Sequence, residues 1–210
     1  NGYGAGVFNK SDAKFNMYGG SVSNNTATDY GQGGGVFNSG EFVMSGGTVS
    51  DNYSGGSGAG IVNLKGTFRM LGNASVRNNI INPENTSATG GGVQNYLGTF
   101  VMLGGEITGN KSNCGGGVSN GAMSDTYTGY TGYSSATFTM TGGKISGNEA
   151  AAVGGGLYNS TGDPEAKVTV NVSGNAVISD NTAKNGGGIG NSGKGTTVTV
   201  SKNVQIKGTI

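Results

Sequence analysis

The side chains that could catalyse a reaction in this 210-residue chain are eleven carboxylates and twelve basic residues. Hydrolysis of a glycosidic bond needs two carboxyl groups about 5–10 Å apart, and a polysaccharide lyase needs acidic metal ligands beside a basic proton acceptor. The acidic residues are scattered, and Arg69 and Arg77 have no acidic cluster near them. Histidine, the commonest general base and transition-metal ligand, is absent from the sequence. We therefore expect no enzymatic activity, metal or cofactor, and keep a polysaccharide lyase or glycosidase as an alternative.

Ligand binding at the surface is the second function that the residues indicate. An irregular stretch, residues 121–137, is rich in Gly, Ser and Thr and contains several tyrosines. Tyrosine in such surroundings provides flat amphipathic rings on an adaptable backbone, as in antibody contact loops, and it also suits stacking on sugars. A second irregular stretch, residues 160–167, carries two carboxylates. The main ligand-binding candidates are these tyrosines and carboxylates: Tyr127, Tyr130, Tyr133, Asp163 and Glu165. The alternative is a pair of solvated loops folded onto the flank of the protein.

Charge and hydropathy argue against several other partners. The net charge is +1 with no long basic run, so the chain lacks the electrostatic footprint of a nucleic-acid-binding protein. No apolar stretch approaches the roughly 18–20 residues that span a bilayer, so we expect no direct membrane insertion. The single cysteine, Cys114, cannot form an internal disulfide.

The candidate residues lie between copies of a repeat, which must position them. The strongest repeated pattern is a triplet of small residues, then an aliphatic residue, a variable residue and asparagine, as in the stretch 33–38. Seven asparagines end these patterns: Asn9, Asn38, Asn63, Asn95, Asn120, Asn159 and Asn191.

Two further segments follow each triplet. The first reads aromatic–any–Met in five copies and Val–any–Val in the last two, and it begins at Phe15, Phe42, Phe68, Phe100, Phe138, Val170 and Val198. The second contains one buried-type aliphatic residue after a glycine turn: Val22, Val49, Val76, Ile107, Ile145, Ile178 and Ile206. Alternation with a period of two residues predicts short strands with one buried face.

The spacing of the repeats predicts the fold. Successive triplet aliphatics are 29, 25, 32, 25, 39 and 32 residues apart, so the minimal period is 25 residues. Three short strands and three turns in such a period form one coil of a parallel solenoid. We therefore predict an all-β, right-handed parallel β-helix of about seven coils that occupies residues 1–210 as one domain. Because the pattern is already under way at Asn1, we expect the chain to be a segment of a longer solenoid.

Stacked coils place equivalent residues directly above one another, about 4.8 Å apart. The phenylalanines, methionines and Val/Ile residues should then form three interior columns. The asparagines should form ladders, because a side-chain amide both donates and accepts hydrogen bonds. Since this architecture accounts for the repeated residues, function is expected at the departures from the repeat.

Three weaker candidates remain beside the main one. Residues 80–89 extend a different corner of the coil, which is also typical of a tolerated surface insertion. An outward column beside the buried aliphatics begins with Phe8, Phe37 and Val62 and could form an exposed apolar face. An ice-binding face would need a regular threonine ladder, and the outward column of the third segment is mixed: Ser23, Ser50, Arg77, Thr108, Ser146, Ser179 and Lys207.

The stretch 137–148, Thr-Phe-Thr-Met-Thr-Gly-Gly-Lys-Ile-Ser-Gly-Asn, is followed by the glycine triplet at 154–156. In this it resembles the repeats of large secreted or wall-attached bacterial β-helix proteins. The repeats resemble more loosely those of the chlamydial polymorphic outer-membrane proteins, since Ser23-Asn24-Asn25-Thr26-Ala27 precedes the triplet at 33–35. The resemblance covers essentially the whole chain and implies adhesin-like display on a bacterial surface. It identifies no ligand.

The sequence thus favours a non-enzymatic binding and display segment located outside the cell or on the bacterial surface. Its expected partner is a host surface or secreted protein, such as an immunoglobulin or a mucin, or a glycan. A purely structural stalk is the alternative. The sequence sets no oligomeric state.

Overall fold

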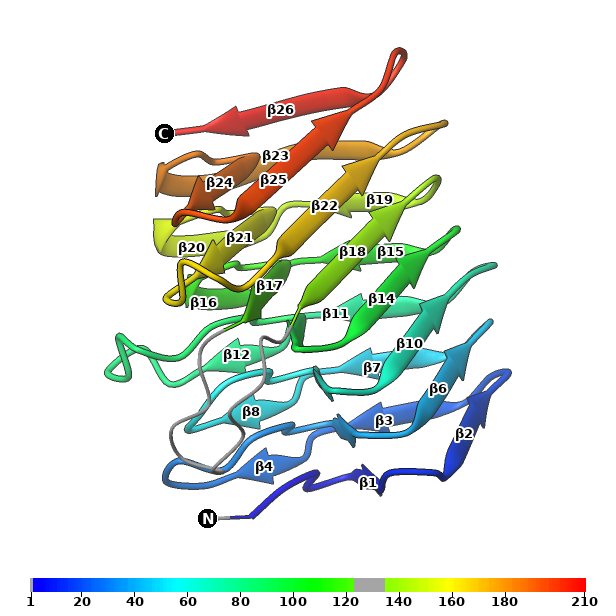
Figure 1. The fold of residues 1–210 in the computed structure, drawn as a ribbon. Helices are drawn as coiled ribbons and strands as arrows, with labels where there is room; N and C mark the ends of the chain where they lie inside the picture. The colour runs from blue at the N-terminus through cyan, green and yellow to red at the C-terminus, as the bar shows by residue number, and fades with distance from the viewer. Residues whose placement is uncertain (1, 123–134) are drawn as a thin grey trace.

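The structure is a computed structural model in which residues 2–122 and 135–210 are described. Strands and their connections make up these residues, and none of them belongs to a helix that could cross a membrane. The chain winds as a right-handed parallel β-helix from β1 at the N-terminal end to β26 (Gln205–Thr209) at the other (Figure 1). The predicted fold class is therefore confirmed.

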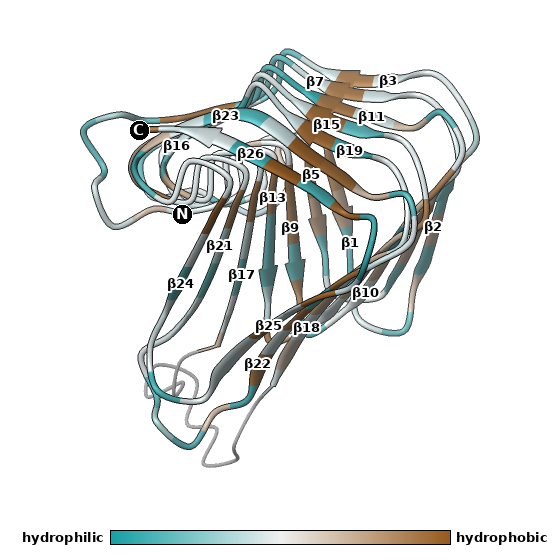
Figure 2. Cartoon of the chain, turned by 90° about the horizontal axis from the view of Figure 1, so that it is seen from above, coloured by the Kyte–Doolittle hydropathy of each residue, from teal (hydrophilic) through white to brown (hydrophobic). Residues whose placement is uncertain are grey.

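Three parallel sheets run along the solenoid, and each coil contributes to all of them (Figure 2). The first sheet contains the strands that follow the small-residue triplets: β1 (Val7–Asn9), β5 (Val36–Asn38), β9 (Ile61–Leu64), β13 (Val93–Tyr96), β17 (Val118–Ala122), β21 (Leu157–Thr161) and β24 (Ile189–Ser192). The second sheet contains the Phe–any–Met strands and their valine counterparts: β2 (Lys14–Met17), β6 (Glu41–Met44), β10 (Thr67–Met70), β14 (Thr99–Met102), β18 (Ala136–Met140), β22 (Val168–Val172) and β25 (Thr196–Val200).

The third sheet has twelve strands because most coils contribute to it twice. Its first arm holds the predicted aliphatic strands: β3 (Ser21–Ser23), β7 (Thr48–Ser50), β11 (Ser75–Arg77), β15 (Glu106–Thr108), β19 (Lys144–Ser146), β23 (Val177–Asn185) and β26. Its second arm holds a fourth short strand per coil, which the sequence did not predict: β4 (Thr26–Ala27), β8 (Tyr53–Ser54), β12 (Ile80–Ile81), β16 (Lys111–Cys114) and β20 (Glu149–Val153). The long β23 pairs with both arms and joins them.

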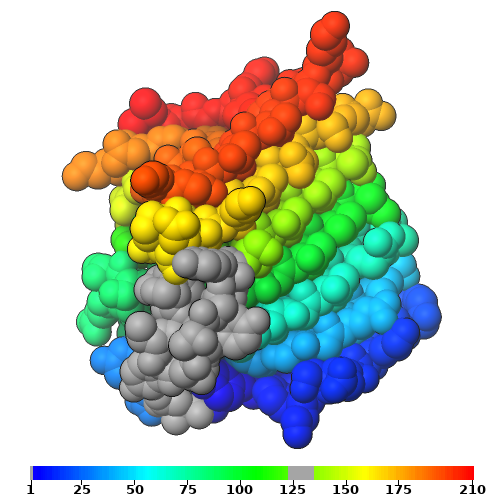
Figure 3. All heavy atoms as spheres, viewed as in Figure 1, coloured from blue at the N-terminus to red at the C-terminus, as the bar shows by residue number. Residues whose placement is uncertain are grey.

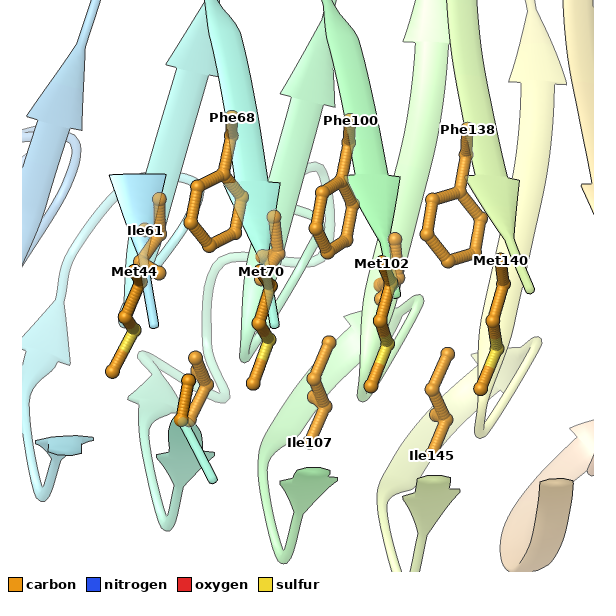
Figure 4. Packing of buried hydrophobic residues seen from close by; sticks show 14 of the residues in the cluster. Met44, Ile61, Phe68, Met70, Phe100, Met102, Ile107, Phe138, Met140 and Ile145 are labelled. Atoms are coloured by element: carbon orange, nitrogen blue, oxygen red, sulfur yellow. The ribbon is translucent and has the colours of Figure 1, made fainter. Parts of the chain in front are cut away.

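The predicted interior columns are present because the strands pair in register, with Phe68 facing Phe42 on one side and Phe100 on the other. From Phe15 to Phe138 the phenylalanine rings stack with centroids 4.7–4.8 Å apart. The methionines of the second sheet and the isoleucines of the other two sheets fill the space beside them (Figure 4). One continuous apolar core therefore extends through the stack.

Two ladders of asparagine side chains run along the solenoid near the turns between successive strands. In the first ladder, each amide nitrogen from Asn9 to Asn159 donates to the amide oxygen of the next coil's asparagine at 2.7–2.9 Å. In the second, which runs from Asn25 to Asn181, the corresponding distances are all 2.9 Å. Nearly all of these amides are buried, and their polar atoms are satisfied by one another and by the main chain. The predicted ladders are confirmed.

The glycine triplets are required at two of their three positions. The first glycine has φ between 60° and 76° in all seven copies, a region that disfavours other residues. The third glycine has no room for a side chain: a Cβ at Gly92 would lie 2.6 Å from the Gly117 carbonyl oxygen and 2.9 Å from Asn110 Nδ2. The triplet therefore lets the turn pack directly against the second asparagine ladder.

Candidate functional site

The loop that carries Asp163 and Glu165 connects β21 to β22 and is fixed by its own hydrogen bonds. Asp163 Oδ1 accepts the Glu165 amide hydrogen at 2.9 Å, and Thr161 Oγ1 accepts the Asp163 amide hydrogen at 3.0 Å. Ala166 anchors the loop in a small apolar cluster with Val168 and residues of the neighbouring coils. Glu165 is exposed, and Asp163 is half-buried. The carboxylates are thus available at this corner, one of them as a turn-forming group.

The tyrosines Tyr127, Tyr130 and Tyr133 lie outside the described residues, so their relation to these carboxylates stays a prediction. The strands on either side of the insert are described: β17 ends at Ala122 and β18 begins at Ala136. Both alanines are buried in the same small cluster as Ala166. The two irregular stretches therefore leave the solenoid at one corner, as the sequence predicts.

The column of Phe8, Phe37 and Val62 forms in register on the outer side of the first sheet. The expected exposed apolar face does not form across all three residues, because Phe37 and Val62 are buried and only Phe8 is exposed, at 53%. The first glycine of a triplet comes close to the outward residue four positions later: a Cβ at Gly58 would lie 2.2 Å from Val62 Cγ2. Tyr3 also packs on Phe37, with ring centroids 4.8 Å apart.

The extension at residues 80–89 folds back onto the coil before it. Asn85 Nδ2 donates to the Gly55 carbonyl oxygen at 2.7 Å, and Ala88 is buried against Ala59 and Ile81. A shallow hollow of about 620 Å³ lies beside this extension, with Asp29 and Glu84 in its lining. These contacts are typical of a surface insertion that is well tolerated by the scaffold.

A groove of about 390 Å³ lies on the outer side of the first sheet, between the two irregular corners. The outward residues Val62, Gln94 and Ser119 lie on adjacent strands in register and belong to its lining. Ser87 and Thr89 line it from the extension at 80–89, and its other boundaries include residues of the opposite corner: Gly121, Ala122, Ser160 and Gly162. The groove therefore joins the departures from the repeat into one site.

Sequence reasoning did not find this groove. One signal was available, because the outward column changes from phenylalanine and valine to Gln94 and Ser119 at the fourth and fifth triplets. A switch from apolar to polar residues at one repeated outward position indicates where that column meets solvent or a ligand.

Two salt bridges in the described part of the chain connect side chains of adjacent coils. Lys14 contacts Glu41 at 2.9 Å, and Lys111 contacts Glu149 at 2.8 Å, with all four side chains well exposed. The hydrogen bond to Glu41 raises the pKa of Lys14. Over residues 2–122 and 135–210, no group of three or more Cys, Asp or Glu side chains could hold a metal ion.

Cys114, at the end of β16, is half-buried, and its burial raises the pKa of the thiol. A raised pKa lowers the thiolate fraction at a given pH, and the thiolate is the reactive form. We expect alkylation of Cys114 at pH 8 to be slower in the folded chain than in the urea-unfolded chain, which measures the contribution of the fold. Equal rates in the two states, followed by mass spectrometry, would show that burial does not protect the thiol.

A regular threonine column does occur, on the second sheet and not on the third. Five threonines pair directly on adjacent coils: Thr67, Thr99, Thr137, Thr169 and Thr197. The successive coils lie side by side as parallel bands on the surface in this view (Figure 3). The neighbouring outward column is mixed: Arg69, Val101, Thr139, Asn171 and Thr199. These columns do not form the two-dimensional array of one residue type that an ice-binding face needs.

Comparisons with protein-family models, with curated proteins and with solved structures found no match to this chain.

Proposed function

We propose that this chain is a non-enzymatic binding and display segment of a bacterial surface or secreted protein. The observation that carries the proposal is the position of the irregular residues. The extension at 80–89 and the corner that bears residues 160–167 both contribute to the groove on the first sheet. Gly121 and Ala122, the first two residues of the irregular stretch 121–137, contribute as well. A structural stalk requires only regular coils. It gives no reason for irregular segments from different coils to line the same groove.

The scaffold itself supports display. Ladders of asparagine and stacked phenylalanine rings fix each coil to the next, so the outer surfaces are held on a rigid frame. Sites on rigid elements keep their geometry better than sites on isolated loops, and they lose less entropy on binding. The bacterial surface location rests on the resemblance of the repeats to those of secreted and wall-attached bacterial β-helix proteins.

The partner is proposed to be an extracellular host protein or a glycan, recognised at the irregular corners. Substituting Tyr127, Tyr130 and Tyr133 together with alanine is expected to weaken binding at least tenfold, which corresponds to about 1.4 kcal/mol, without lowering the thermal midpoint. The measurement is titration of the chain and its variant against immobilised immunoglobulin, mucin and a panel of glycans. Unchanged affinity would remove the tyrosines from the site.

A structural stalk is the competing function, and the same screen distinguishes it. A stalk is expected to bind none of these ligands while remaining folded by circular dichroism. Release of reducing sugar or of an unsaturated product from a polysaccharide would instead identify a carbohydrate-active enzyme.

A further inference from the structure

The described residues that line the groove on the first sheet are uncharged. Fifteen described residues line it, and none is Asp, Glu, Lys or Arg. The larger hollow beside residues 80–89 contains Asp29 and Glu84 in its lining, so the described linings of the two sites differ in charge. An ionic ligand would lose its hydration in the groove without gaining a charged partner. The lining therefore favours an uncharged ligand.

The groove offers hydroxyl and amide groups to such a ligand. Ser119 is only 4% exposed, and its hydroxyl makes no hydrogen bond to any described protein group. The Ser119 hydroxyl is not among the fully buried unpartnered atoms of the described residues, so it is open to the groove and can hydrogen bond to a ligand hydroxyl there. Gln94 Nε2 makes one long hydrogen bond, 3.4 Å to Thr89 Oγ1. Its amide oxygen accepts no hydrogen bond from the described residues, so it is available as an acceptor.

An aromatic ring completes the lining at the N-terminal end. Tyr3 is 54% exposed and lines the groove, and the ring of Phe37 packs against it at a tilt of 51°, with the ring centroids 4.8 Å apart. An exposed tyrosine ring that is held in place by a neighbouring ring can stack on the C–H face of a sugar, while its hydroxyl remains in water. Gln32, which pairs with Tyr3 by a β-bridge, provides another amide beside this ring.

The groove also follows the axis of the solenoid. Its outward lining residues come from adjacent coils, from Val62 through Gln94 to Ser119 and on to Ser160. With a coil repeat near 4.8 Å, the five coil steps from Tyr3 to Ser160 extend over roughly 24 Å. A chain-like ligand can therefore contact several coils at once, and a volume near 390 Å³ is within the usual range for a small-molecule site.

We propose that this groove binds an uncharged oligosaccharide along the solenoid axis. Ser119 and Gln94 hydrogen bond to its hydroxyl groups, and Tyr3 stacks on one sugar ring. This inference rests on the proposed binding function and names the ligand class and the residues of the site.

The test is titration of the 210-residue chain with uncharged oligosaccharides of glucose, galactose, mannose and N-acetylglucosamine, and with sialylated or sulfated counterparts. Calorimetry and saturation-transfer NMR provide the readout. We expect saturable binding of at least one uncharged oligosaccharide, with its acidic counterpart binding more weakly. Ser119→Ala is expected to weaken that binding by roughly three- to tenfold, the range of one hydrogen bond. Tyr3→Ala and Gln94→Leu are expected to weaken it by at least as much.

Two variants control for effects on folding. Ser146→Ala removes a serine of similar burial, 7% exposed, from the outer side of the third sheet and is expected to leave affinity unchanged. Ser119→Leu fills the floor of the groove and is expected to abolish saccharide binding in a chain that still unfolds cooperatively.

The proposal would be overturned by full affinity in Ser119→Leu, or by a preference for the acidic saccharides. Binding of a protein ligand without binding of any uncharged saccharide would overturn the groove assignment and leave the proposed binding function standing. A folded chain that binds nothing would overturn both.

Discussion

Replacement of Phe100 with alanine is expected to lower the free energy of unfolding by about 3–5 kcal/mol. Phe100 is fully buried inside the phenylalanine column, with ring centroids 4.7 Å from both Phe68 and Phe138. Alanine would leave a cavity bounded by two rings that cannot move together, because in-register pairing fixes their strands. Urea denaturation followed by far-ultraviolet circular dichroism measures the change.

Two control variants make this prediction specific to the column. Phe8→Ala removes the same side chain from a position that is 53% exposed, where it stacks on Phe37, and is expected to lower stability by less than about 1.5 kcal/mol. Met102→Leu conserves volume in the adjacent buried column and is expected to cost less than about 1.5 kcal/mol. A Phe100→Ala variant no less stable than Phe8→Ala would contradict the view that the ring stack stabilises the solenoid.

Asn95→Ala is expected to lower the free energy of unfolding by about 2–4 kcal/mol, although it removes only a polar side chain. The Asn95 amide accepts a hydrogen bond from Asn63 at 2.7 Å and donates one to Asn120 at 2.7 Å. It also donates to the main-chain oxygens of Gly98 and Thr137. Alanine would break the ladder in its middle and leave buried polar atoms on both sides without partners.

The matched control for this variant is Asn171→Ala. Asn171 is on the outer side of β22 and makes no side-chain hydrogen bond to the described residues. Its replacement is expected to change stability by less than about 0.5 kcal/mol in the same urea titration. Equal losses in the two variants would mean that the ladder contributes no more than a surface amide.

The architecture could be predicted because parallel stacking turns sequence periodicity directly into contacts. A residue type that recurs at one repeat position must lie above its copies, so Phe42, Phe68 and Phe100 predict a column without any knowledge of distances. The ladder asparagines follow in the same way. Insertions did not obscure the pattern, since they are confined to corners between strands.

The fourth strand of each coil could not be predicted in this way. Its copies share spacing but no residue type, as Thr26–Ala27, Tyr53–Ser54 and Ile80–Ile81 show. Main-chain hydrogen bonding between adjacent coils holds these segments, and main-chain hydrogen bonding requires no particular side chain. A pattern search that relies on repeated side chains therefore misses them.

The candidate site was predicted in part. The sequence located the irregular corners and the outward column, but alternation alone assigned Phe37 and Val62 to the surface. Their burial depends on a glycine turn that folds over the column and on the ring of Tyr3, which belongs to a neighbouring coil. The groove depends on corners that are distant in sequence, from Tyr3 to Gly162, and that only the stacked fold brings together.

The most direct test of the proposed binding function is whether the folded 210-residue chain binds an extracellular ligand at all. The measurement is titration against uncharged oligosaccharides, acidic oligosaccharides, immunoglobulin and mucin, with urea denaturation of each variant in parallel. We expect saturable binding that Ser119→Leu abolishes in a chain that still unfolds cooperatively, with a loss of stability of no more than about 1–3 kcal/mol. A cooperatively folded chain that binds none of these ligands would contradict the proposed binding function and identify the solenoid as a spacer.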